Sequence, residues 1–294
     1  MSFKNGEYNV ELNGIKHWVK IDGSEHKTRP LIIIHGGPGG NHYTFERTIG
    51  PLLTDKRTIV YYEQRGCGRS QKPHSDSDYT VDILIKDFFQ LKKWLSTEKV
   101  DLLGYSFGGE LALEFAYAFP EEINDLVLSG PSLMHSEIQI MIQITGFMSV
   151  VNKDLYKQFL LLTKNIFSID DLYKKIWEMV DTETVDLLLF NNQEIAKKNR
   201  QFWEESKLVN TGLMIKALYE NPGKIPIELR LKEIRQRTLI ITGVFDRNTG
   251  VSISNIIHRE LSNSSLRLFD KSAHFPDLEE TYLFAGTAVE FLES

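Results

Sequence analysis

The sequence predicts an α/β protein with a mostly parallel central sheet, flanking helices and an inserted helical lid. Short runs rich in β-branched residues alternate with helix-like segments in residues 1–132 and again in residues 232–294, as in a parallel sheet with crossover helices. Between them, residues 133–231 contain long amphipathic stretches instead. We therefore expect one α/β core, residues 1–132 and 232–294, and a helical cap, residues 133–231.

The first element is predicted to be a β-hairpin, since two alternating runs meet at Asn13-Gly14, a dipeptide that favours a type I′ turn. Buried strands are then expected in four apolar runs, residues 30–37, 57–66, 99–106 and 123–131. Helices are expected in residues 80–98, which carry an apolar stripe of period 3.6, and in residues 108–123.

After the cap the same alternation returns. Residues 237–246 and 264–275 are expected to contain strands, and residues 251–263 and 281–294 are expected to form helices. In open α/β sheets, ligands bind at the carboxyl ends of the strands. Candidate functional residues are therefore sought where each predicted strand ends.

The composition is that of an ordinary globular protein, with 294 residues of which 41% are hydrophobic and 25% charged. A net charge of −6 gives no electrostatic reason to bind nucleic acid or an anionic membrane. The N-terminus has no apolar core after a basic start. The longest apolar stretch, residues 137–151, is shorter than the ~18–20 residues that span a bilayer. We expect a cytoplasmic protein.

The clearest motif is Gly104-Tyr105-Ser106-Phe107-Gly108, which matches the G-x-S-x-G pattern between a predicted strand and a predicted helix. The pattern presents a serine nucleophile on a strained turn, and glycines let the strand and the helix approach each other. The amino end of the helix also directs N–H groups at the reaction centre. Taken alone, the pattern leaves open a tight turn with a spectator serine.

A serine nucleophile needs a base and an orienting acid. Asp246 and His274 follow the two returning strands, and the order Ser106, Asp246, His274 is that of a hydrolase triad on this type of fold. His274 is expected to take the serine proton, while Asp246 orients the imidazole. Each also has a structural alternative, as a turn aspartate and a surface histidine. His35 precedes the serine and is expected to brace a loop.

The glycine-rich loop in residues 35–40 follows the first predicted core strand. A nucleotide-binding loop is the alternative, but the G-x-G-x-x-G and Gly-Lys-Ser/Thr spacings are absent. As an oxyanion hole the loop would supply the N–H of Gly37, beside the N–H of Phe107, because Pro38 has no N–H to donate.

Together, "HGGPGG" at 35–40, "YYEQRGCGRS" at 61–70, "GYSFGG" at 104–109, and the late Asp246 and His274 resemble the proline iminopeptidase family of α/β-hydrolases, which includes the tricorn-interacting aminopeptidases. The resemblance covers the core and is weak in residues 133–231. It implies an α/β-hydrolase fold, a lid over the site, no metal or cofactor, and release of N-terminal residues, often proline, from short peptides.

The resemblance also implies that acidic lid residues hold the free amino group of the substrate. The familiar acidic signature is missing, and Lys207 stands where a glutamate is expected. Glu204 and Glu205 are the candidates, with solvated glutamates on a helix face as the alternative. Tyr43 and Tyr105 are further candidates for substrate contact.

The turn at 61–70 contains Arg65, Cys67 and Arg69. Both arginines are expected to brace the turn, with contact to a substrate carboxylate as the alternative for Arg65. Cys67 is the only cysteine, which excludes an intrachain disulfide and a cysteine-cluster zinc site. A reactive role for Cys67 would need a lowered thiol pKa.

These observations predict a serine aminopeptidase of proline iminopeptidase type that takes a short peptide or small molecule as substrate. Because the acidic signature is missing, a carboxylesterase or lactonase acting on small esters is the alternative. A catalytically inactive binding protein is a third hypothesis. A binding protein would not need a nucleophile, a base and an oxyanion loop together.

Overall fold

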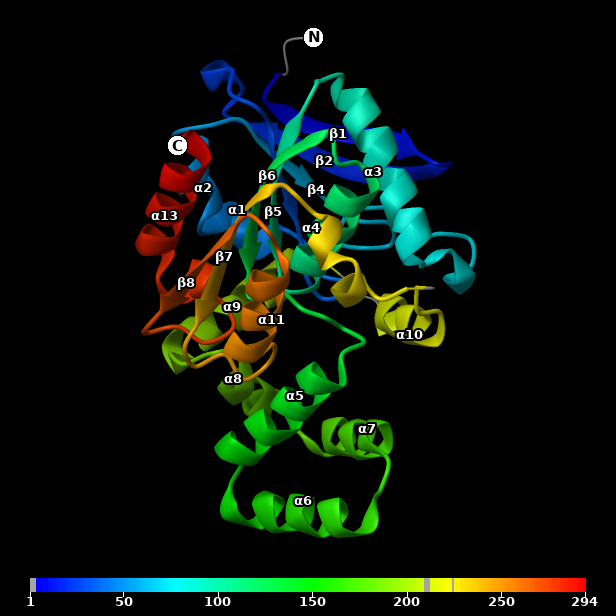
Figure 1. Cartoon of the computed structure of the whole chain (residues 1–294), viewed down its shortest axis with the longest axis vertical. Helices are drawn as coiled ribbons and strands as arrows, with labels where there is room; N and C mark the ends of the chain where they lie inside the picture. Colours follow the sequence, from blue (N-terminus) through cyan, green and yellow to red (C-terminus); the bar gives the residue numbers. More distant parts are fainter. Residues whose placement is uncertain (1–3, 209–211, 224) are drawn as a thin grey trace.

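The structure, a computed structural model, describes residues 4–208, 212–223 and 225–294. An eight-stranded sheet in the order β1-β2-β4-β3-β5-β6-β7-β8 runs through its centre (Figure 1). Strands β3 to β8 are parallel to one another, and β2 pairs antiparallel with β1 and β4. The strands are β1 (Gly6–Leu12), β2 (Ile15–Asp22), β3 (Leu31–Ile34), β4 (Ile59–Tyr62), β5 (Val100–Tyr105), β6 (Ile123–Ser129), β7 (Arg237–Gly243) and β8 (Ser264–Phe269). The predicted α/β fold with a mostly parallel sheet is confirmed.

The predicted hairpin is β1 and β2, which pair from Leu12 opposite Ile15 outward. Asn13 and Gly14 have φ angles of 47° and 74°, the two positive values that a type I′ turn requires. The Asn13 side chain donates a hydrogen bond of 2.8 Å to Asp87 Oδ1. The turn is therefore tied to the helix that covers the sheet.

Helices cover both faces of the sheet, as expected when its strands are apolar on both sides. On one face lies a hydrophobic cluster that includes residues of α3, α4 and α11. On the other face a second cluster includes residues of α1, α2 and α13. These helices are α1 (Tyr43–Arg47), α2 (Gly50–Thr54), α3 (Val81–Leu95), α4 (Phe107–Ala118), α11 (Gly250–Glu260) and α13 (Thr281–Glu293), and the short α12 (Pro276–Glu279) precedes α13.

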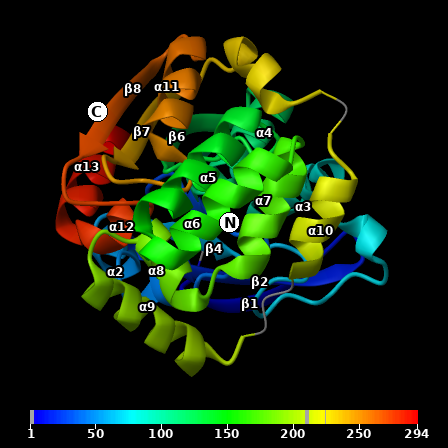
Figure 2. The same cartoon turned by 90° about the horizontal axis from the view of Figure 1, so that it is seen from below.

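In the described part of the chain, six α-helices lie between β6 and β7. Figure 1 shows α5, α6 and α7 standing beyond the end of the sheet, and Figure 2 shows them from below, in front of the rest of the molecule. Together with α8 they enclose a hydrophobic cluster of their own, centred on Phe147, Phe159 and Leu188. The six are α5 (Glu137–Val150), α6 (Lys153–Asn165), α7 (Ile169–Met179), α8 (Thr182–Leu189), α9 (Gln193–Ser206) and α10 (Gly212–Glu220).

The other two inserted helices lie against the core. α10 contributes Met214, Ala217 and Leu218 to the main cluster, and α9 meets α1 where Thr44 Oγ1 donates to Asn199 Oδ1 over 3.2 Å. The stretch that the sequence presents as one long amphipathic segment divides into α8 and α9. Asn192 caps α9, since its side chain accepts from Glu194 N over 3.0 Å.

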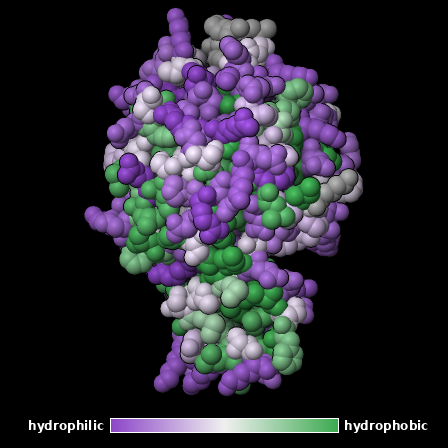
Figure 3. All heavy atoms as spheres, viewed as in Figure 1, coloured by the Kyte–Doolittle hydropathy of each residue, from purple (hydrophilic) through white to green (hydrophobic). Residues whose placement is uncertain are grey.

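The projecting helices and the connection between α6 and α7 expose apolar side chains, including Met141, Leu161 and Phe167. Figure 3 shows hydrophobic atoms gathered on this part of the surface and at its junction with the core. Within the three described ranges, every helix is too short or too polar to cross a membrane.

Candidate active site

Ser106 lies at the turn between β5 and α4, at the carboxyl edge of the sheet. Its φ and ψ are 56° and −125°, a region that non-glycine residues occupy only under strain. Three backbone hydrogen bonds hold it there. Ser106 N donates to Ser129 O over 2.9 Å, and Ser106 O accepts from Gly109 N and Ser132 N over 2.9 and 3.2 Å. The turn therefore has the strained geometry that the motif predicts.

The glycines around Ser106 are required by close packing. A Cβ on Gly104 would strike the backbone of Gly108, and one on Gly108 would strike the carbonyl oxygen of Ile34. A Cβ on Gly36 would lie 2.9 Å from Ser106 Cβ. Strand, helix and glycine-rich loop thus meet at the serine with no room for another carbon atom.

The two predicted partners of Ser106 lie beside it. His274 Nε2 is 3.0 Å from Ser106 Oγ, and His274 Nδ1 is 3.1 Å from Asp246 Oδ2. An ionised carboxylate only accepts, so Nδ1 carries the proton and donates to Asp246, which leaves Nε2 as the acceptor for the serine hydroxyl. Asn248 Nδ2, 3.1 Å from Nε2, is a second donor to that nitrogen. No sequence motif indicated Asn248.

Asp246 is buried, and burial alone would raise its pKa. The neighbouring His274 and hydrogen bonds from Asn248 and Thr249 outweigh burial, so the pKa is lowered. Thr249 Oγ1 donates to Asp246 Oδ2 over 2.8 Å, and Asn248 N donates to Oδ1 over 2.8 Å. The carboxylate is therefore ionised and fixed beside the imidazole.

The glycine-rich loop after β3 lies on the other side of Ser106. Gly36 and Gly37 line the same cavity as Ser106 and Phe107. Gly37 has a φ of 123°, and a Cβ there would lie 2.6 Å from Gly39 N. Phe107 begins α4, so its N–H has no partner within that helix. Both predicted oxyanion donors are thus at the cavity wall beside the serine.

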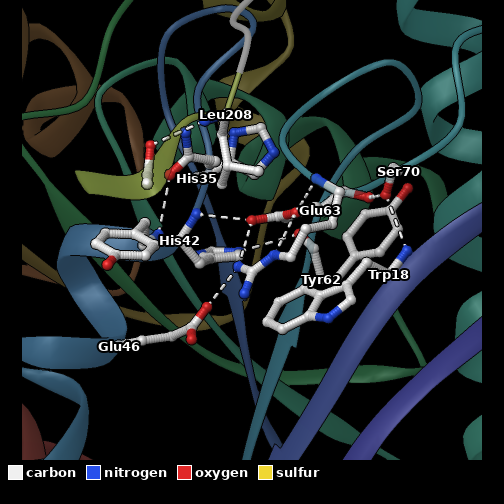
Figure 4. A network of polar contacts seen from close by, with 12 residues as sticks. Trp18, His35, His42, Glu46, Tyr62, Glu63, Ser70 and Leu208 are labelled. Carbon is white, nitrogen blue, oxygen red and sulfur yellow. Dashed lines mark hydrogen bonds and ion pairs between the residues drawn. The ribbon is translucent and has the colours of Figure 1, made fainter. Parts of the chain in front are cut away.

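A buried polar network supports the glycine-rich loop. Glu63 is fully buried and accepts from His42 N over 3.1 Å and from Arg69 N over 2.6 Å. Figure 4 shows Glu63 between His42 and Glu46 on one side and Ser70 on the other. Burial lowers the pKa of His42 well below its usual value, so this histidine is neutral and serves as packing and hydrogen-bond support.

His35 is also a support residue, as predicted. It is fully buried, its Nε2 accepts from Gln64 N over 3.1 Å, and its carbonyl accepts from Gln64 Nε2 over 2.9 Å. Burial lowers its pKa. The loop is therefore connected to the turn that follows β4.

Arg65 and Arg69, the arginines of that turn, also have a structural role. Arg65 donates to both oxygens of Asp87 over 2.6 and 2.7 Å, and Arg69 pairs with Glu63 and Glu46. The alternative that Arg65 contacts a substrate carboxylate is wrong, because its guanidinium is buried against Asp87. Burial raises the pKa of the Cys67 thiol, which leaves Cys67 as a packing residue.

A cavity of about 990 Å³ lies above Ser106 and His274, between residues of the core and residues of the inserted helices. Apolar and aromatic side chains form most of its wall, including Phe45, Phe107, Met134, Ile140, Tyr173, Trp177, Trp203, Tyr219 and Phe275. Four carboxyl groups also line it: Asp170, Glu178, Glu220 and Asp277. Lys174 and Lys216 line it as well, so the site is a large apolar pocket with a few charged groups of both signs.

Of the four predicted substrate contacts, only Tyr105 lines the cavity. Its hydroxyl donates to Asn41 O over 3.0 Å. Tyr43 is not part of the wall; its ring lies under the Arg47 guanidinium. Glu204 and Glu205 are exposed and also lie outside the wall.

These two glutamates therefore lie outside the cavity wall, for a geometric reason. α9 presents Asn199 and Trp203 to the cavity. Successive helical residues are rotated by about 100°, so Glu204 and Glu205 turn away from the face that Trp203 shares with Asn199. Gln139 and Gln143, two glutamines one turn apart on α5, also line the cavity, and no sequence motif indicated them.

Comparison with known proteins agrees with this geometry. Residues 29–281 match the alpha/beta hydrolase fold family. Proline iminopeptidases from Saccharolobus solfataricus and Lactobacillus helveticus are each 26% identical to the chain, over 100% and 98% of it and 96% and 97% of their own lengths.

Solved structures share the fold. A proline iminopeptidase-related protein from Thermus thermophilus has a TM-score of 0.82 at 20% identity, over 99% of this chain and 98% of that one. An esterase from Exiguobacterium antarcticum has a TM-score of 0.72 at 19% identity, over 99% and 100%. The chain therefore belongs to the α/β-hydrolase fold family, as a serine-type member similar to the proline iminopeptidases.

Proposed function

We propose that this protein is an aminopeptidase that releases N-terminal residues, proline among them, from short peptides through an acyl-enzyme on Ser106. The observation that carries the proposal is the hydrogen-bonded series Ser106, His274 and Asp246, whose serine and histidine line a large cavity. The similarity to proline iminopeptidases over the whole chain supports the substrate class.

The geometry suits acylation of Ser106. Ser106 Oγ attacks the carbonyl carbon of the N-terminal residue while its proton passes to His274 Nε2, 3.0 Å away. Asp246 stabilises the resulting imidazolium. The oxyanion of the tetrahedral intermediate lies at the N–H groups of Gly37 and Phe107, and one such donor contributes about 3 kcal/mol to the barrier reduction.

Collapse of the intermediate breaks the C–N bond, and His274 returns the proton to the departing amine. Water then repeats the sequence: it attacks the acyl carbon, gives its proton to His274, and Ser106 leaves with that proton restored. Residues 133–231, as the proposed cap, shield the acyl-enzyme from bulk water between the two halves.

A carboxylesterase is the second candidate. Two observations favour it: most of the cavity wall is apolar, and neither Glu204 nor Glu205 reaches the cavity. An ester substrate needs no partner for a free amine, so these features would suffice for it.

The two candidates separate in one assay series. The purified protein is given L-prolyl- and L-alanyl-p-nitroanilide, their N-acetylated forms, and p-nitrophenyl butyrate, with Ser106→Ala as control. The aminopeptidase proposal expects cleavage of both free-amine anilides and little of the acetylated ones. Cleavage of the ester with none of the anilides would reject it in favour of the esterase.

A further inference from the structure

Asp277 is a buried carboxyl group that the triad does not use. It is the second residue of α12, three positions after His274, and only 4% of its surface is exposed. It lines the cavity above Ser106. Among the residues that the structure describes, its Oδ1 has no hydrogen-bond partner.

A buried carboxylate oxygen without a hydrogen-bond partner makes the ionised form energetically unfavourable. Burial raises the pKa of Asp277 to about 7, against the opposing effects of its own backbone and of His274, while Glu279 adds to the rise. Buried unpaired polar groups are rare in folded proteins and call for an explanation. A ligand that brings a positive charge and a donor would remove the penalty.

The other three carboxyl groups of the wall differ from Asp277. Asp170, Glu178 and Glu220 belong to the inserted helices and are exposed. Two of them already pair with lysines, Glu178 with Lys175 at 2.8 Å and Glu220 with Lys216 at 3.8 Å. Exposed charges are screened by water and contribute little net attraction. They form an outer rim, whereas Asp277 lies in the core wall that carries His274.

The position of Asp277 next to the triad also favours binding of a substrate amine. In a peptide the terminal amino nitrogen is separated from the scissile carbonyl carbon by only one atom. A group that binds this nitrogen must therefore lie next to the triad. Asp277 follows His274 in one short segment of the core, and His274 is close enough to act on its charge.

We propose that Asp277 binds the free amino group of the substrate, the role that the sequence assigned to Glu204 and Glu205. The substrate class rests on the proposed function, but amine binding does not. The ammonium donates to Oδ1 and neutralises the carboxylate within the cavity wall.

The test uses inhibition of p-nitrophenyl butyrate hydrolysis by a matched pair of small molecules. L-Prolinamide carries the amine, and cyclopentanecarboxamide has a methylene group in place of the ring nitrogen. We expect L-prolinamide to inhibit the intact protein about 10- to 100-fold more strongly, the range for a charged hydrogen bond. In Asp277→Asn this ratio should fall to near one, and in Asp277→Glu it should be partly retained.

Glu178→Gln is the matched control, because it removes a carboxylate at the rim of the same cavity. This variant should keep the inhibitor ratio of the unmodified protein. Thermal melts show whether Asp277→Asn is folded, and Asp277→Ser is the substitute if it is not. A ratio near one in the unmodified protein overturns the inference. The inference is also overturned if the ratio in Asp277→Asn stays as high as in the unmodified protein, or if the ratio falls to near one in Glu178→Gln.

The inference and the proposed function can fail separately. If the ratio depends on Asp277 but no aminoacyl anilide is cleaved, the amine site stands and the aminopeptidase proposal falls. If the anilides are cleaved but the ratio survives in Asp277→Asn, the aminopeptidase stands and another group holds the amine.

Discussion

The two walls of the cavity are built in different ways. On the core side, His274 and Asp277 line the cavity and Asp246 pairs with His274. All three are less than 10% exposed, and strand ends and a helix terminus position them. On the cap side, the acidic residues Asp170 and Glu178 are exposed on α7, which belongs to the separate hydrophobic cluster, and Glu220 is exposed at the end of α10. Chemistry that depends on fixed charge therefore belongs to the core wall, and the cap wall supplies mainly shape and apolar surface.

The contrast has a physical basis. In a buried site an interaction between charges is far stronger than in water, but each charge must be paired or it raises the free energy of the fold. Asp246 is paired by His274, Asn248 and Thr249. Within the described part of the chain, Asp277 Oδ1 is left without a partner. The difference between these two carboxyl groups is what marks Asp277 as a place for a ligand.

The largest effect on the core wall is expected from removing the nucleophile. Ser106→Ala should lower kcat for every ester or anilide that the protein cleaves by about 10⁴- to 10⁶-fold, because the acyl-enzyme can no longer form. Steady-state rates under saturating substrate measure this. A loss below tenfold would mean that another group carries the reaction.

Asp246→Asn should lower kcat by about 10³- to 10⁴-fold, since an amide favours the wrong imidazole tautomer for accepting the serine proton. A melting temperature close to that of the unmodified protein is the accompanying control. Full activity in a folded Asp246→Asn protein would place Asp246 outside the mechanism.

Substitutions in the buried ion pairs that support the site should affect the stability of the fold more than the catalytic rate. Asp87→Asn is expected to reduce the free energy of unfolding by about 3–5 kcal/mol, because it leaves the buried Arg65 charge without its partner. Urea unfolding followed by tryptophan fluorescence measures the change. A loss under 1 kcal/mol would show that the pair is not buried as described.

Asp277→Asn should change how stability depends on pH. Since the folded pKa of about 7 lies above an unfolded value near 3.9, the folded state binds more protons between these values. Its stability therefore falls as pH rises from about 4 to 7. Glu110, with a pKa also raised by burial to about 7, gives the same trend, so the comparison with the variant isolates Asp277.

Relative to the unmodified protein, Asp277→Asn should gain on the order of 1–3 kcal/mol at pH 8 and nothing at pH 4. Urea titrations at the two pH values measure the difference, with His274 and Glu279 as the neighbouring titratable groups in both proteins. An equal change at both pH values would mean that Asp277 is not a raised-pKa group.

The smallest effects are expected on the outer face of the cap. Glu205→Gln should alter kcat/KM for L-prolyl-p-nitroanilide by less than twofold and stability by about 0.5 kcal/mol or less, because Glu205 is exposed and outside the cavity. A tenfold rise in KM would indicate that Glu205 contacts the substrate after all. It would then contradict the difference described between the two walls.

Local patterns were enough to predict the sheet, the hairpin at Asn13-Gly14 and the approach of Ser106, Asp246 and His274. Strand ends in a parallel sheet meet at one edge, so sequence order and chain position fix such contacts. The glycines of the elbow were informative for a similar reason, since only close packing explains them.

The cap could not be predicted in the same detail. Whether Trp203 or Glu204 faces the cavity depends on how α9 is rotated against the core, and the sequence of an exposed helix does not determine that rotation. Asp277 was missed because its significance lies in burial and in a missing partner, and both arise only when segments distant in the sequence come together.

The central claim, that Ser106 is the nucleophile activated by His274 and Asp246, is most directly tested by covalent labelling. The protein is treated with diisopropyl fluorophosphate, digested and analysed by mass spectrometry. We expect one adduct, on the peptide that contains Ser106, formed much more slowly in Asp246→Asn and absent in Ser106→Ala. An adduct on a different residue, or equal labelling of Ser106→Ala, would contradict it.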